Sequence, residues 1–176
     1  MRYFIKIILV VLGIFAINQA ALAIEIGEVP PKVELKENLG GRLDGKPWSS
    51  EELQGKVNII FYVDPDESDT NNPASEALSK EKFPADKVHT YGIINMAATW
   101  KPNFIISALL KKKQDKYPKT TYVRDYKKVL VNAWKIADDS SDVLAFDKKG
   151  KLIFKKDGKL NPEEIQTLIK VVRDNL

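Results

Sequence analysis

The chain has 176 residues, of which 44% are hydrophobic and 30% are charged, a composition typical of one globular domain and not of a disordered or fibrous protein. It contains no cysteine, which excludes thiolate nucleophiles, thiolate metal ligands and disulfide exchange. Its formal net charge is +4, from 28 basic and 24 acidic residues. We therefore expect one domain that performs no thiol chemistry.

Residues 1–23 have the features of a cleavable signal peptide. Arg2 and Lys6 give a positive start, residues 7–17 form an apolar run, and residues 21–23 match an A-x-A cleavage pattern. The apolar run is well short of the roughly 20 residues that a membrane-spanning helix needs. We expect cleavage after residue 23, no membrane span in the mature protein, a periplasmic location and a domain over residues 24–176.

The mature chain is expected to be close to neutral. Loss of Arg2 and Lys6 lowers the 28 basic residues to 26 against 24 acidic ones, which leaves a net charge of +2. Nucleic-acid binding needs a clustered basic face, whereas the lysine-rich segments 111–116 and 148–156 are interpreted as solvated faces. A DNA-binding regulator is the third function class that we considered, and no nucleic-acid partner is expected.

The first half of the chain predicts strands and helices in alternation. Residues 33–37 alternate apolar and charged side chains, as an edge strand does, and Ser49-x-x-Glu52 has the pattern of a capping box before a short helical turn. The apolar, β-branched run 57–63 predicts a central strand buried on both faces. We then expect a helix from Asn72-Pro73 to about Phe83 and a strand over residues 88–96.

The second half predicts a helix, two hairpins and a final helix. We expect the helix over residues 103–116, a short hairpin that pairs 120–123 with 129–134, and a clearer hairpin that pairs 143–146 with 152–154. Asn161 caps the last helix, whose apolar positions follow the helical period: Ile165, Leu168, Ile169 and Val172. The order of elements, without internal repeats, predicts one α/β domain.

Several motifs resemble those of exported thioredoxin-like and peroxiredoxin-like proteins, namely Leu43–Phe61, which contains Asp44-Gly45-Lys46-Pro47-Trp48, and Asp147–Leu152. The C-terminal half resembles the YtfJ family of periplasmic thioredoxin-like proteins through Tyr117-Pro118, Ala133-Trp134, Asp138–Ser141 and Lys156-Asp157-Gly158 before Glu163-Glu164. The resemblance implies a thioredoxin-like three-layer sandwich, with a central mixed sheet flanked by helices and an N-terminal extension. It implies no particular activity.

The resemblance also shows what is missing from the chain. In redox-active relatives a Cys-x-x-Cys pair follows the central strand and a cis-proline precedes a later strand, whereas the matching positions here hold Asp66–Asp69 and Ser141. The resemblance therefore implies a redox-inactive protein without thiol oxidoreductase or peroxiredoxin activity. A periplasmic binding or accessory module that uses the former active-site surface is the leading functional hypothesis.

Four carboxylates follow the central strand within a short loop: Asp64, Asp66, Glu67 and Asp69. Carboxylate oxygens suit hard cations such as calcium, so an enzyme or cation-binding protein that uses Asp64, Asp66 and Asp69 is the alternative hypothesis. An EF-hand is not expected, because Asp69 and Ser75 stand where that loop needs glycine and glutamate. A solvated loop at the positive N-terminus of the next helix is the preferred interpretation, and no cofactor other than a divalent cation is considered.

No catalytic residue is expected. His89 is the only histidine, it is expected at the surface near the start of a strand, and the chain has no G-x-S-x-G motif for a serine nucleophile. Tyr62 and Trp134 end apolar runs and are expected in the core. Trp100 is expected to pack within its loop, with an exposed side chain that binds a ligand as the alternative.

In the thioredoxin fold, three loops should converge at one edge of the sheet: residues 64–69, 97–102 and 138–142. The candidate binding residues are Asp64, Asp66, Glu67, Asp69, Asp139 and Ser141, with Trp100 at the rim. Clustered carboxylates, to which Asp138 and Asp142 would add, cost stability unless a cation balances them. We therefore expect an acidic surface whose ligand is a metal ion or a basic segment of an unidentified periplasmic protein.

Overall fold

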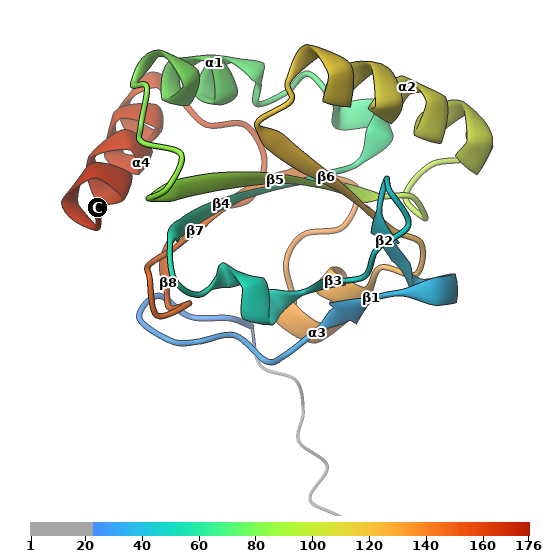
Figure 1. Ribbon diagram of the computed structural model, residues 1–176, viewed down its shortest axis with the longest axis horizontal. Helices are drawn as coiled ribbons and strands as arrows, with labels where there is room; N and C mark the ends of the chain where they lie inside the picture. Colours follow the sequence, from blue (N-terminus) through green and yellow to red (C-terminus); the bar gives the residue numbers. More distant parts are fainter. Residues whose placement is uncertain (1–22) are drawn as a thin grey trace, which may run out of the picture.

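The computed structural model describes residues 23–176, so the predicted signal peptide lies outside the described residues except for its last residue, Ala23. Within the described part, no helix is long and apolar enough to cross a membrane. The middle layer is a six-stranded sheet of β2 (Gly40–Arg42), β6 (Thr120–Asp125), β5 (Val88–Asn95), β4 (Val57–Val63), β7 (Ser141–Phe146) and β8 (Leu152–Lys156), in that order (Figure 1). A two-stranded sheet pairs β1 (Glu34–Leu35) with β3 (Trp48–Ser49).

The sheet is mixed, and its register determines which loops meet. Strands β4, β5 and β6 run parallel, whereas β7 runs antiparallel to β4. Val63 at the end of β4 pairs with Ile94 near the end of β5 and with Ser141 at the start of β7. The carboxyl ends of β4 and β5 therefore share one edge of the sheet with the amino end of β7.

Helices and a small sheet cover the two faces, as Figure 1 shows. One face carries α1 (Asn72–Lys80), α2 (Asn103–Lys116) and α4 (Pro162–Asp174), and the other carries α3 (Val129–Trp134) and the β1–β3 pair. Alternate residues of β4 face the two outer layers. Phe61 packs in the apolar cluster that includes α1 and α4, and Ile60 packs in the cluster that includes α3. The predicted thioredoxin-like three-layer sandwich is confirmed.

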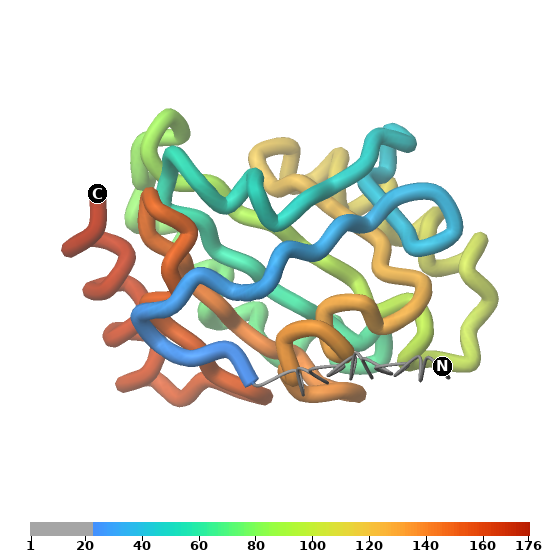
Figure 2. The backbone as a smooth tube through the Cα atoms, turned by 90° about the horizontal axis from the view of Figure 1, so that it is seen from below, coloured from blue at the N-terminus to red at the C-terminus, as the bar shows by residue number. Residues whose placement is uncertain are grey.

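The predicted N-terminal extension crosses the face opposite α1 and α2 (Figure 2). Ile24 is buried in the core, and its backbone N–H donates to the carbonyl of Trp134 at 3.2 Å. Gly27 N–H donates to Leu152 at 2.7 Å. Of the predicted edge strand at 33–37, only Glu34–Leu35 is a strand, and it pairs with β3.

Local signals located most elements correctly. Ser49 and Glu52 form the predicted capping box at the start of the 3-10 helix η2 (Ser50–Leu53), and Asn161 and Glu164 form another at the start of α4. The remaining 3-10 helices are η1 (Glu37–Leu39) and η3 (Pro65–Glu67). Helix α2 has the predicted bounds, and α1 ends at Lys80, before the predicted end.

The predicted hairpin of 120–123 with 129–134 is wrong. Residues 120–125 form β6, which pairs in parallel with β5, and residues 129–134 form α3. The carboxylate of Asp125 accepts the N–H groups of Val129 at 2.9 Å and Leu130 at 3.1 Å, which caps the helix. Leu130 and Trp134 are one helical turn apart and fully buried, so a short apolar run that suits a strand forms a helix instead.

Candidate functional site

The three loops that were predicted to converge do so at the sheet edge where β4 and β5 end and β7 begins. Asp64 N–H donates to the carbonyl of Ser140 at 2.8 Å, which joins the loop after β4 to the segment before β7. The Thr99 hydroxyl donates to Oδ2 of Asp66 at 2.8 Å, which joins the same loop to the loop after β5. Residues 64–71, 95–102 and 138–141 are called the loop surface below.

Two lysines pair with three of the carboxylates that were predicted for this surface. Lys101 forms an ion pair with Asp66, and Lys128 lies 2.6 Å from Asp138 and 3.8 Å from Asp139. The hydrogen bonds from Lys101 and Thr99 lower the pKa of Asp66, and the hydrogen bond to Asp138 raises the pKa of Lys128. These ion pairs compensate part of the predicted acidity, whereas Glu67 and Asp69 are exposed and form no ion pair within residues 23–176.

The predicted metal candidates Asp64, Asp66 and Asp69 each contact neighbouring protein groups. Asp64 is 5% exposed and its carboxylate accepts the N–H of Asp66 at 2.8 Å, which caps η3, while burial raises its pKa. Asp69 accepts the side-chain amide of Asn72 at 3.0 Å, and Glu67 accepts the hydroxyl of Thr70 at 2.5 Å. Within residues 23–176, no group of three or more His, Asp or Glu side chains could hold a metal ion. These carboxylates shape their own loop.

Ser141 lies at the predicted junction and is 2% exposed, at the start of β7. Asn71, which the sequence interpretation missed, donates its amide to the carbonyl of Ser141 at 2.8 Å, to the Ser141 hydroxyl at 3.1 Å and to the carbonyl of Gly158 at 3.0 Å. Its carbonyl oxygen accepts Leu160 N–H at 3.0 Å. The described residues contain no cis peptide bond. A buried amide network thus fills the junction between α1, β7 and the start of α4.

Asp142 does not contribute to the loop surface, contrary to expectation. Its side chain is fully buried, and neither carboxylate oxygen has a hydrogen-bond partner of regular geometry. Burial raises its pKa to about 6. Alternation along β7 places it on the same side as Leu144 and Phe146, in the layer that includes α3. A buried carboxylate of this kind costs stability when it is ionised.

His89 is half-buried, not exposed as predicted. Its Nε2 lies 2.9 Å from the hydroxyl of Thr121, and its ring packs edge-on against Tyr91 with centroids 4.6 Å apart. Burial lowers the pKa of His89. The ring of His89 thus packs against Tyr91 and contacts the hydroxyl of Thr121 inside the sheet region.

Trp100 lies in the loop after β5 and is 87% exposed, so the expectation that it packs within the loop is wrong. Its neighbours Thr99 and Lys101 both contact Asp66, which ties the loop down on either side of the indole. Tyr62 and Trp134 are buried as predicted. A large aromatic side chain on an anchored loop is a feature of binding surfaces.

An exposed apolar face on α2 continues from Trp100. Phe104 is 74% exposed, Leu109 is 53% exposed and Ile105 is 42% exposed. The sequence contained a signal for this face, because apolar residues surround the first turns of α2 on all sides, more than one buried face requires.

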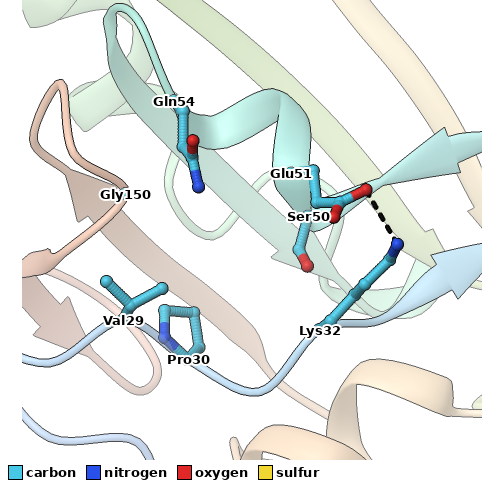
Figure 3. Close-up of a pocket in the computed structure, with 7 residues that line it drawn as sticks. All are labelled: Val29, Pro30, Lys32, Ser50, Glu51, Gln54 and Gly150. Atoms are coloured by element: carbon cyan, nitrogen blue, oxygen red, sulfur yellow. Dashed lines mark ion pairs between the residues drawn. The ribbon is translucent and has the colours of Figure 1, made fainter.

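A hollow of about 180 Å³ lies near the amino end of β4, at the opposite end of the strand from the loop surface (Figure 3). Its lining residues are Val29, Pro30, Lys32, Ser50, Glu51, Gln54 and Gly150. Lys32 and Glu51 pair across it at 2.8 Å, so its charges are already balanced. This hollow presents no nucleophile with an adjacent base and is not the candidate site.

The sequence matches the family described as "Bacterial protein of unknown function (YtfJ_HI0045)" over residues 18–175. It is 30% identical over 168 residues to an uncharacterized protein of Haemophilus influenzae, covering 90% of this chain and 91% of that protein. It is 32% identical over 132 residues to the uncharacterized protein YtfJ of Escherichia coli, covering 73% of this chain and 71% of that protein.

Among solved structures, the thioredoxin domain of a thiol-disulfide oxidoreductase from Bacteroides vulgatus superposes with a TM-score of 0.61. The match covers 85% of this chain and 99% of that domain at 18% sequence identity. At this level of identity the likeness shows a shared fold, while the cysteines of a thiol-disulfide enzyme have no counterpart in this chain.

Proposed function

The chain belongs to the YtfJ_HI0045 family of bacterial proteins, and we propose that it is a periplasmic binding or accessory module. It docks a partner protein through the loop surface and the adjoining apolar face of α2. Its thioredoxin-like fold without cysteine is a redox-inactive scaffold. The signal-peptide pattern in residues 1–23 supports the proposed location.

The exposure of Trp100 is the observation that carries the proposal. Transfer of apolar side-chain area from water into an interface is worth about 25 cal/mol per Å². Trp100 is 87% exposed on an anchored loop, so in the free protein its indole does not contribute this free energy of burial. Thr99 and Lys101 hold the loop through Asp66, so a partner need not order it on binding.

The alternative hypothesis, an enzyme or cation-binding protein based on Asp64, Asp66 and Asp69, lacks a comparable observation. Asp66 is paired with Lys101, and Asp69 is hydrogen-bonded to Asn72. The carboxylate of Asp64 accepts a backbone N–H of its own loop. A cation would compete with these contacts for the carboxylate oxygens. Binding of a protein partner requires no such competition.

The proposal is tested by photo-cross-linking in the bacterium that makes this protein. Trp100 is replaced by a benzophenone amino acid, and the matched control carries the same residue at Ile26, an apolar side chain that is 59% exposed on the N-terminal segment. We expect a discrete heavier product from position 100 and none from position 26. The absence of a product at position 100, or the same products from both positions, would refute the proposal.

A further inference from the structure

The exposed face of α2 changes character along the helix. At 100° per residue, Phe104, Ile105, Leu109 and Lys112 fall within one face, and Ile106 and Leu110 on the other side pack into the core. The first two turns of the exposed face are therefore apolar and the last turns are basic. Figure 1 shows α2 at the end of its layer, away from α4.

The lysines of the last turns lack ionic partners. Lys111, Lys112 and Lys116 are exposed, and none of them belongs to an ion pair within residues 23–176. Asp115 is the only carboxylate among these turns. We call the line of exposed side chains from Trp100 through Phe104 and Leu109 to Lys112 and Lys116 the strip. It runs from bulky apolar side chains to an excess of positive charge.

A second copy of this chain does not complement the strip. If two copies of α2 packed antiparallel about a two-fold axis, Phe104 of one copy would face Lys112 and Lys116 of the other. If they packed parallel, the lysines would face each other and repel.

A flat anionic membrane is also a poor match. It would attract the lysines but would have to approach Glu67 and Asp69 as well, which are exposed on the loop beside α2, where Lys113 Nζ lies 3.5 Å from the carbonyl of Ser68. A helix about 10 Å wide contacts the strip alone and avoids these carboxylates.

We propose that this strip docks an amphipathic helix of a partner protein, whose bulky apolar residues cover Trp100, Phe104 and Leu109 and whose carboxylates face Lys112 and Lys116. The inference rests on the proposed function and names the chemistry of the partner. Apolar contact supplies the affinity, and the charge pairing sets the direction in which the helix lies.

The test uses two synthetic helical peptides with leucines at i, i+3, i+4 and i+7. One carries a C-terminal run of glutamates, and the other carries lysines in the same positions. Binding is followed by the fluorescence of Trp100, because Trp48 and Trp134 are fully buried and contribute a constant background. We expect a blue shift and saturable binding with the glutamate peptide, and affinity at least about tenfold weaker for the lysine peptide.

Charge reversal supplies the decisive variant. Lys112→Glu with Lys116→Glu should reverse the preference between the two peptides, and Phe104→Ser with Leu109→Ser should abolish binding of both. Lys87→Glu with Lys159→Glu, two exposed lysines outside α2, should change neither affinity. All these positions are exposed, so folding is checked by an unchanged thermal transition.

Three outcomes would overturn the inference. Equal affinity for both peptides would show that the strip does not select a helix with carboxylates. A blue shift with phosphatidylglycerol vesicles, but with neither peptide, would assign the strip to a membrane. Sedimentation could also show self-association, and if the Phe104→Ser, Leu109→Ser variant abolished it, the strip would bind a second copy. If cross-linking from position 100 still captures a discrete partner in these cases, the proposed function stands and only the partner's chemistry is wrong.

Discussion

The side-chain amide of Asn71 donates to both the carbonyl oxygen and the hydroxyl oxygen of Ser141, at 2.8 and 3.1 Å. This contact joins the residue just before α1 to the first residue of β7, which are 70 positions apart in the sequence. Asn71 is therefore a structural junction between α1, β7 and the segment before α4.

Loss of this junction is expected to destabilise the fold. Asn71→Ala would leave the carbonyls of Ser141 and Gly158 and the N–H of Leu160 without their partner in a buried site. We expect the free energy of unfolding, measured with urea, to fall by about 2–4 kcal/mol. Asn72→Ala is the matched control: Asn72 is exposed and bonds only to Asp69, so a loss below about 1 kcal/mol is expected. Equal losses for both variants would contradict a special role for Asn71.

Asp142 should make the protein less stable as the pH rises. Its pKa is raised by burial to about 6, from an ordinary value of 3.8. Between these values the unfolded chain has lost the proton that the folded chain retains, so a rise in pH favours unfolding, and below pH 3.8 the penalty is absent. The stability of Asp142→Asn relative to the wild type should therefore grow by about 2–3 kcal/mol from acidic to neutral pH.

Urea unfolding of both proteins across this pH range measures the effect. Asp66→Asn provides a control of opposite sign, because Lys101 lowers the pKa of Asp66 and its contribution is present at neutral pH and lost in acid. A pH-independent difference between Asp142→Asn and the wild type would show that the Asp142 carboxylate titrates normally.

Quenching of tryptophan fluorescence should resolve one accessible side chain and two protected ones. Trp48 and Trp134 are fully buried, and Trp100 is 87% exposed. We expect acrylamide to quench one component strongly, and Trp100→Phe to remove that component without lowering the thermal midpoint. If Trp100→Phe left the quenching unchanged, the loop would have to pack as the sequence interpretation supposed.

Calorimetric titration with calcium, magnesium and manganese is expected to give no sub-millimolar binding to the loop surface. Lys101 already neutralises Asp66, and Asp64 and Asp69 bond within their own loop. Sub-millimolar binding that Asp66→Asn and Asp69→Asn abolish would restore the cation hypothesis.

Patterns within a few neighbouring residues predicted much of the fold. The strand Val57–Val63 follows from an unbroken apolar run, and the capping boxes at Ser49 and Asn161 follow from side chains that bond to backbone groups three positions away. Such interactions depend on local spacing, which is visible in the chain itself. The absence of thiol chemistry likewise follows from composition alone.

The tertiary structure decided what lies far apart in the chain. Val129–Trp134 is too short for its period to distinguish a strand from a helix, and Asp125 with the core contacts of Leu130 determines the result. The ion pair of Lys101 with Asp66 depends on which loops the sheet register brings together. Whether Trp100 is exposed depends on what the surrounding loops leave uncovered, because burial is a property of the assembled surface and not of the spacing between residues.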